Sequence, residues 1–168
     1  MKNRLGIIGG GQLGMMITEA AQNLTDEISE ITVLDPTENC PASQSGAKQI
    51  VGDFKDEIAI LKLAEQSDII TYEIESGNTD VLSKLKAKIE PSPSTLGTIQ
   101  DKLSQKIFLS ENELPVSEFY EITSLDDLRE KINELGLPVL LKSRRDAYDG
   151  RGNFKITSSD EIEKAYQC

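Results

Sequence analysis

The chain has 168 residues and a formal net charge of −11, with 38% hydrophobic and 28% charged residues. This length supports a real hydrophobic core, in one large domain or in one domain and part of another. The negative charge argues against general nucleic-acid binding, and no apolar run approaches the ~20 residues needed to cross a bilayer. We therefore expect a cytoplasmic protein with no nucleic-acid and no membrane partner.

The cysteine and histidine content excludes several kinds of site. Cys40 and Cys168 lie far apart without metal-ligand spacing, and histidine is absent from the sequence. This pattern argues against a zinc site or a structural disulfide. Nucleophilic catalysis by a Ser–His or Cys–His pair is also excluded within this chain.

The first stretch with a functional pattern is LGIIGGGQLG, residues 5–14, in which an apolar run of strand type ends in three glycines. Gly9, Gly11 and Gly14 have the G-x-G-x-x-G spacing, and a helical pattern follows them. Glycines let the backbone approach an anion, and the first turn of a helix offers unpaired N–H groups. The stretch predicts a phosphate-binding turn between a strand and a helix.

Helices and strands alternate after this turn. Apolar residues at helical spacing predict a helix over 12–23 whose buried face holds Leu13, Met16, Ile17, Ala20, Ala21 and Leu24. Further segments of this unit are predicted as strands at 31–34, 47–51 and 67–72, and as helices at 56–66 and 79–88. The alternation predicts an α/β domain over residues 1–95, with a Rossmann-like parallel sheet covered on both faces.

The pattern changes after the proline-bearing segment 90–93. Residues 96–112 are predicted to form a helical linker, which places Lys102 and Lys106 on one helical face. A second unit over 113–168 is predicted to contain strands at 116–122, 138–143 and 153–157, a helix from Ser124 to Leu135, and a last helix from Ser158 to Cys168.

Two interpretations remain open for the loop that joins the strands at 138–143 and 153–157. It carries basic residues and glycines in an acidic protein, namely Lys142, Arg144, Arg145, Gly150, Arg151 and Gly152. A glycine loop with cationic flanks can fold over a polyphosphate and exclude water from a transfer step. The alternative is a solvated β-hairpin with incidental basic residues.

Acidic residues near the predicted ends of two strands also allow two interpretations. Asp35 follows the glycine turn by about 20 residues, where a dinucleotide-binding domain places the acid that binds a ribose hydroxyl. It is equally a turn residue before Pro36. Glu73 and Glu75 are expected to face the crevice beside the glycine turn, where carboxylates suit a hydroxyl-rich ligand. An NAD(P)-binding Rossmann domain of a redox or regulatory protein is therefore an alternative, and a non-catalytic scaffold with a dimer contact in its first domain is another.

Taken together, the segments resemble the ATP-grasp superfamily, and within it the N5-carboxyaminoimidazole ribonucleotide synthetases of purine biosynthesis. The resemblance rests on stretches spread over the whole chain: GIIGGGQLG (6–14), VLDPTENCPA (33–42), DIITYEIE (68–75), PSPSTLGTIQDKLSQK (91–106), LPV (114–116) and LPVLLKSRRDAYDGRGNF (137–154). It implies a pre-ATP-grasp domain followed by the first part of an α+β ATP-grasp domain. It also implies a carboxylating ligase that forms a C–N bond.

The resemblance implies a reaction in which ATP and bicarbonate give carboxyphosphate, whose carboxyl group is captured by the amine of aminoimidazole ribonucleotide. Matching positions imply substrate binding by Gly11, Gln12, Leu13 and Glu73, and ATP binding by Lys102, Lys142, Gly150 and Gly152. They imply catalytic roles for Tyr148, Asp149 and Arg151. Many relatives have lysine at position 151, so Arg151 keeps the charge but presents a planar fork.

The resemblance also implies that the Mg²⁺ ligands and the adenine-binding residues lie beyond Cys168, so we expect no metal ligands in this chain. We expect this chain to be a truncated N-terminal fragment that is inactive as a synthetase. The full-length enzyme is expected to be a homodimer.

Overall fold

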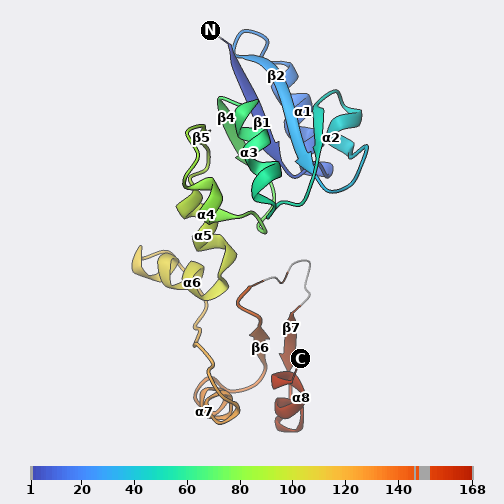
Figure 1. Ribbon diagram of the computed structural model, residues 1–168. Helices are drawn as coiled ribbons and strands as arrows, with labels where there is room; N and C mark the ends of the chain where they lie inside the picture. The colour runs from blue at the N-terminus through green and yellow to red at the C-terminus, as the bar shows by residue number, and fades with distance from the viewer. Residues whose placement is uncertain (1, 146, 148–151, 168) are drawn as a thin grey trace. The chain divides into compact units, whose positions relative to one another are not determined.

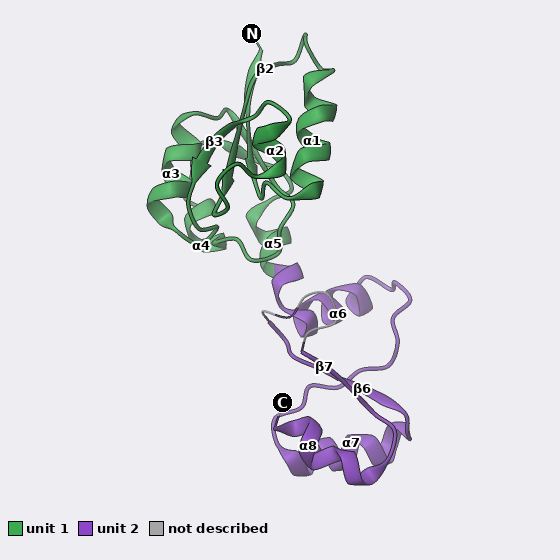
Figure 2. Ribbon diagram, turned by 90° about the vertical axis from the view of Figure 1, so that its right-hand side faces the viewer, with its two compact units in different colours: residues 1–97 green, residues 98–168 purple. Residues whose placement is uncertain are grey.

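The computed structural model describes residues 2–145, 147 and 152–167, and Figure 1 traces the path of the chain. The chain divides into two compact units, Met1–Gly97 and Thr98–Cys168, which are coloured separately in Figure 2. Among the residues described, none of the helices is both long enough and apolar enough to span a membrane.

The first unit is built on a five-stranded parallel sheet. Its strands, in the order β3-β2-β1-β4-β5, are β3 (Lys48–Val51), β2 (Ile28–Asp35), β1 (Asn3–Ile8), β4 (Ile69–Tyr72) and β5 (Lys88–Ile89). The chain adds β2 and β3 on one side of β1 and then β4 and β5 on its other side. The carboxyl ends of β1 and β4 therefore flank a topological switch point. This arrangement confirms the predicted α/β fold.

Helices cover both faces of this sheet (Figure 1). Ile7 packs in the same cluster as residues of α1 (Gln12–Gln22) and α2 (Pro41–Gln44). Its neighbour Ile8 packs in the other cluster, with residues of α3 (Glu57–Glu65) and α4 (Thr79–Leu82). Successive side chains of a strand point to opposite faces, so adjacent isoleucines in β1 serve two separate cores.

The predicted buried face of α1 is right only in part. Ala21 is buried and Ile17 packs partly buried against the same cluster, as predicted. Gly14 and Thr18 are also buried, whereas Leu13 and Met16 are 56% and 54% exposed. Apolar spacing favoured the large side chains, but small residues let the helix approach the loop before it closely. The buried Thr18 hydroxyl forms its hydrogen bond within the helix, donating to the Gly14 carbonyl over 2.9 Å.

The predicted helix over 79–88 is also too long. Asn78 caps α4 by accepting from the Val81 N–H over 3.1 Å, and the helix ends at Leu82. Residues Lys88 and Ile89 instead form β5 beside β4, with the Lys88 N–H donating to the Asp68 carbonyl over 3.0 Å. Pairing with the edge of the sheet overrides the local helical preference of this segment.

The second unit begins within α5 (Pro93–Gln100) and continues with α6 (Lys102–Glu111) and α7 (Leu125–Leu135). An antiparallel hairpin of β6 (Val139–Lys142) and β7 (Asn153–Ile156) follows. A 3₁₀ turn (Ser159–Glu161) then leads into α8 (Ile162–Tyr166). The core of the unit consists of Leu128, Ile132, Ile156, Ile162 and Ala165. Ser124 caps α7 and Gly136, with φ of 77°, follows its last residue, as the sequence predicts.

Two predictions for this unit are wrong, the second only in part. Residues 116–122 have no strand, because a strand needs a hydrogen-bonded neighbour and β6 pairs only with β7 among the residues described. Ser158 is a cap, as predicted, and forms a capping box with Glu161, but it caps a 3₁₀ turn; the last α-helix begins after that turn, at Ile162.

Acid sensitivity of the first unit is predicted from the pair of Arg4 and Asp68. Arg4 at the start of β1 donates to both Asp68 oxygens, which lowers the pKa of that carboxyl to about 2 from 3.8. The stability from this pair is complete above pH ~4 and is lost as the pH falls toward 2. In Asp68→Asn this part of the acid dependence should disappear from urea unfolding measured between pH 2 and 6. The exposed Asp26→Asn variant is the control, and an unchanged acid dependence in Asp68→Asn would contradict the assignment.

Candidate functional site

The glycine turn lies at the switch point of the parallel sheet, between the end of β1 and the start of α1. Gly9 has φ of 102°, a conformation that residues with a Cβ rarely adopt, and a Cβ there would lie 2.5 Å from Glu73 Oε1. A Cβ at Gly14 would overlap the carbonyl oxygen of Gly9. Glycine is therefore required at both positions for the helix to begin directly above the strand.

The backbone N–H groups of the three glycines in this turn each have a hydrogen-bond acceptor within the protein. Gly9 donates to the Leu34 carbonyl over 3.0 Å, and Gly10 donates to Asp35 Oδ2 over 2.7 Å. The Gly11 N–H is hydrogen-bonded to Glu73. Gln12 and Leu13 come next, in the first turn of α1, where no side chain of the described residues caps the helix. Their N–H groups are the donors that an anion at this turn would meet.

Both oxygens of the Asp35 carboxylate are hydrogen-bonded within the protein. It is 7% exposed, and its second oxygen, Oδ1, accepts from the Thr37 N–H over 2.8 Å, forming an Asx turn before the chain leaves β2. Both carboxylate oxygens therefore hold the backbone. This favours the structural interpretation of Asp35 over a ribose-binding role.

Glu73 follows directly after β4 and its N–H donates to the Ile8 carbonyl over 3.1 Å, which brings its side chain beside the glycine turn. Burial raises the pKa of the Glu73 carboxyl above its usual value; the bond from the Gly11 N–H partly offsets this, and the charge of Asp35 adds to it. Glu75 is exposed and lies past the end of the strand, so strand alternation does not pair it with Glu73.

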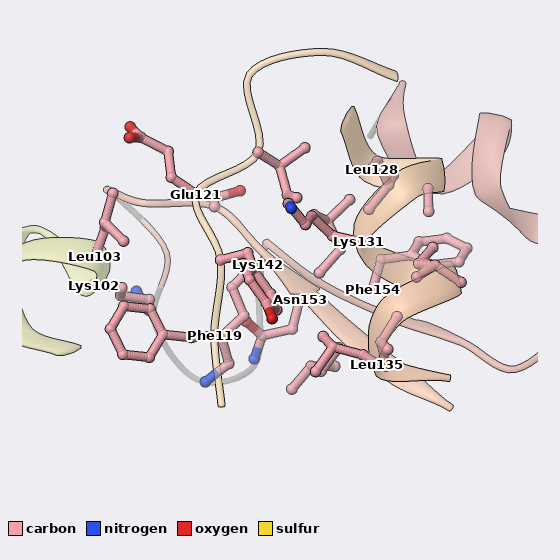
Figure 3. A pocket seen from close by; sticks show the side chains of 18 of the residues that line it. Lys102, Leu103, Phe119, Glu121, Leu128, Lys131, Leu135, Lys142, Asn153 and Phe154 are labelled. Atoms are coloured by element: carbon pink, nitrogen blue, oxygen red, sulfur yellow. The ribbon is translucent and has the colours of Figure 1, made fainter. Parts of the chain in front are cut away.

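The second unit contains a cavity of about 830 Å³ between α6, the segment 117–122 and the β6–β7 hairpin. Figure 3 shows Lys102 and Lys142 among its lining side chains. Lys142 pairs with Asn153 at the end of the hairpin, and the Ser143 N–H donates to the Gly152 carbonyl over 2.8 Å. The structure thus brings together the predicted Lys102, Lys142 and Gly152. Tyr148, Asp149, Gly150 and Arg151 lie outside the described residues.

Sequence reasoning missed the carboxylate that organises this region. Asp101, 2% exposed, accepts from Arg144 Nη2 over 2.7 Å and lies 3.3 Å from Arg145 Nε. Arg144 also donates to Glu121 over 2.6 Å. Two of the basic residues of this loop, Arg144 and Arg145, are therefore paired with protein carboxylates, which for these two favours the interpretation without a ligand. An aspartate directly before a helical lysine is an N-cap signal, but its arginine partner is 43 residues away and leaves no local pattern.

Metal ligands are not gathered in the part of the chain that the structure describes. No group of three or more His, Cys, Asp or Glu side chains arranged to hold an ion occurs among those residues. No Mg²⁺ ligand is therefore assigned to them.

The fold and the position of the glycine turn agree with a known family. The family model for the ribonucleotide synthetase preATP-grasp domain matches residues 1–100, and the model for the ATP-grasp domain matches residues 107–168. This chain belongs to the ribonucleotide synthetase preATP-grasp family.

Individual proteins and a solved structure are similar to this chain over nearly its whole length. The N5-carboxyaminoimidazole ribonucleotide synthase of Staphylococcus epidermidis is 36% identical over 97% of this chain and 43% of its own length. The chloroplastic phosphoribosylaminoimidazole carboxylase of Vigna aconitifolia is 40% identical over 96% of this chain and 28% of its own. The crystal structure of the Aspergillus clavatus N5-carboxyaminoimidazole synthase with ADP and 5-aminoimidazole ribonucleotide has a TM-score of 0.87 and 36% identity, covering 99% of this chain and 43% of that one. The chain spans less than half the length of these relatives.

Glu73→Gln is predicted to remove a pH-dependent loss of stability. Because the folded pKa of Glu73 is raised, the carboxyl group disfavours folding once the pH rises through its unfolded value of 4.5 toward the folded value. Urea unfolding between pH 4 and 8 should show a smaller decline in stability with rising pH in Glu73→Gln than in the parent chain. The exposed Glu75→Gln variant serves as the control. An equally steep decline in stability with rising pH in Glu73→Gln would contradict the assignment of that decline to the Glu73 carboxyl.

Proposed function

We propose that the protein to which this chain belongs carboxylates 5-aminoimidazole ribonucleotide to N5-carboxyaminoimidazole ribonucleotide. ATP transfers its γ-phosphoryl group to bicarbonate, which gives carboxyphosphate and ADP. The amine of the ribonucleotide then attacks the carboxyl carbon, and inorganic phosphate leaves. The products are the carbamate, ADP and phosphate.

The observation that carries this proposal is the division of donors and acceptors at the glycine turn. The N–H groups of Gln12 and Leu13 lie in the first turn of α1 without a side-chain cap among the described residues, while the oxygens of Asp35 accept from the Gly10 and Thr37 N–H groups. Uncapped amides suit one phosphate group, and Glu73 beside them suits ribose hydroxyls. A dinucleotide would require an acid in the position of Asp35 that is available to its ribose. The complex of the Aspergillus clavatus enzyme with ADP and aminoimidazole ribonucleotide supports the same choice.

The nucleotide belongs, in this proposal, at the second unit. Lys102 and Lys142, which line the cavity, would meet the phosphates of ATP, and the loop to which Gly150 and Gly152 belong would cover them. Asp149 would orient the substrate amine, with Tyr148 and Arg151 beside it. Mg²⁺ would accompany the nucleotide.

Further parts of the proposal concern the whole protein. We place it in the cytoplasm and expect a homodimer. Its domains would be the substrate-binding domain over 1–95, the helical linker over 96–112, and the first part of the ATP-grasp domain over 113–168.

The proposal is tested by calorimetric titration of this chain with aminoimidazole ribonucleotide and, separately, with NAD. The ribonucleotide should bind and NAD should not. Glu73→Gln should weaken ribonucleotide binding at least about tenfold, because a hydrogen bond to a charged group contributes roughly 1.5 kcal/mol or more.

Glu75→Gln is the matched control, since Glu75 is an exposed carboxylate two residues further along the same segment. It should leave the affinity unchanged. Tight NAD binding, or equal ribonucleotide affinity in both variants and the parent chain, would contradict the proposed substrate site.

A further inference from the structure

The start of α6 and the base of the 144–152 loop meet at Asp101. The carboxylate is almost entirely buried and caps the helix, with Oδ1 accepting from the Leu103 N–H over 3.0 Å and from the Ser104 N–H over 3.1 Å. An aspartate, an asparagine or a serine could satisfy these two N–H groups equally well. The cap alone therefore does not explain why the residue carries a charge.

The charge is explained by Arg144. Its Nε donates to both Asp101 oxygens, over 3.1 and 3.2 Å, and its Nη2 donates to Oδ2 over 2.7 Å. This fork geometry is strong and directional when the acceptor is a carboxylate. An amide at position 101 that keeps the cap through its oxygen turns an N–H donor toward the guanidinium, so only a carboxylate serves both partners.

Arg144 is held a second time by the residue that follows Asp101. The Lys102 N–H donates to the Arg144 carbonyl over 2.9 Å, and Lys102 Nζ donates to the Ala147 carbonyl over 2.6 Å. Asp101 binds the side chain of Arg144 while Lys102 binds its main chain. Asp101, the cap of α6, and Lys102, its first residue, thus fix the position at which the loop leaves β6. That position is Arg144, two residues after Lys142.

We propose that Asp101 is a positioning residue that holds the ammonium group of Lys102 in register with Lys142 for contact with the phosphates of a nucleoside triphosphate. This inference rests on the proposed function. The two lysines come from different elements, α6 and β6, and the Asp101–Arg144 pair joins these elements directly. An ammonium group has three donors, so Lys102 retains two for a phosphate while bound to Ala147.

The structural part of the inference is tested by residue-specific amide exchange, measured by NMR on the 168-residue chain. In Asp101→Asn the helix cap is retained, so the Leu103 and Ser104 amides should keep their exchange rates. The Lys102 amide should exchange about tenfold faster, since its acceptor Arg144 is no longer held. A role in general stability would instead accelerate all three amides equally.

Two further variants keep this test decisive. Arg144→Lys retains the charge but removes the fork, and should accelerate the Lys102 amide in the same way even if Asp101→Asn does not fold. Glu121→Gln removes the exposed partner of Arg144 and should change none of the three amides. Equal acceleration of all three amides, or no change at Lys102, in the variants of the pair would overturn the inference.

The functional part is tested by titrating the parent chain, Asp101→Asn, Arg144→Lys and a control variant, Glu111→Gln, with Mg–ATP. Glu111 is exposed and does not line the cavity, so Glu111→Gln should bind like the parent chain, and Asp101→Asn and Arg144→Lys should bind several-fold more weakly. Equal affinity in all four proteins would overturn the positioning role. Failure of the parent chain to bind Mg–ATP would contradict the proposed nucleotide site instead, so the two failures are distinguishable.

Discussion

The first unit depends on two carboxylates that bind two of three consecutive glycines from opposite sides. Asp35 at the end of β2 binds the Gly10 N–H, and Glu73 after β4 binds the Gly11 N–H. Because β2 and β4 flank β1 in the sheet, the turn is held from both neighbouring strands. The donors that remain at the start of α1 are directed at the sheet's carboxyl edge, where parallel α/β sheets bind ligands.

This arrangement has an electrostatic cost. Two carboxylates beside the glycine turn oppose the binding of an anion there, and burial together with the charge of Asp35 raises the pKa of Glu73. Both oxygens of Asp35 accept from backbone N–H groups, whereas Glu73 has one such bond and remains the adaptable acceptor. Such a residue is suited to hydroxyl groups, which can donate to a carboxylate. In the second unit the buried carboxylate of Asp101 is instead paired with a positive charge, that of Arg144.

Patterns that are local in sequence predicted most of the fold. The spacing of Gly9, Gly11 and Gly14, the alternation of strands and helices, and the cap at Ser124 each specify a short segment and each is present. Predictions failed where contacts distant in sequence decide the outcome. The buried face of α1 packs with residues of β2 and α2, which leaves Leu13 and Met16 exposed, and β5 forms because β4 offers an edge. The partner of Arg144 lies 43 residues away in the sequence, so Asp101 was not identified as part of a site.

The central claim is that the N–H groups of Gln12 and Leu13 receive the single phosphate of a ribonucleotide. Amide chemical shifts measured during addition of aminoimidazole ribonucleotide, and of the same nucleoside without its phosphate, test it most directly. The account predicts large shifts at Gln12 and Leu13 with the ribonucleotide only, and a small shift at Gly10, whose N–H is held by Asp35. Equal shifts with the nucleoside, or shifts confined to other parts of the chain, would contradict it.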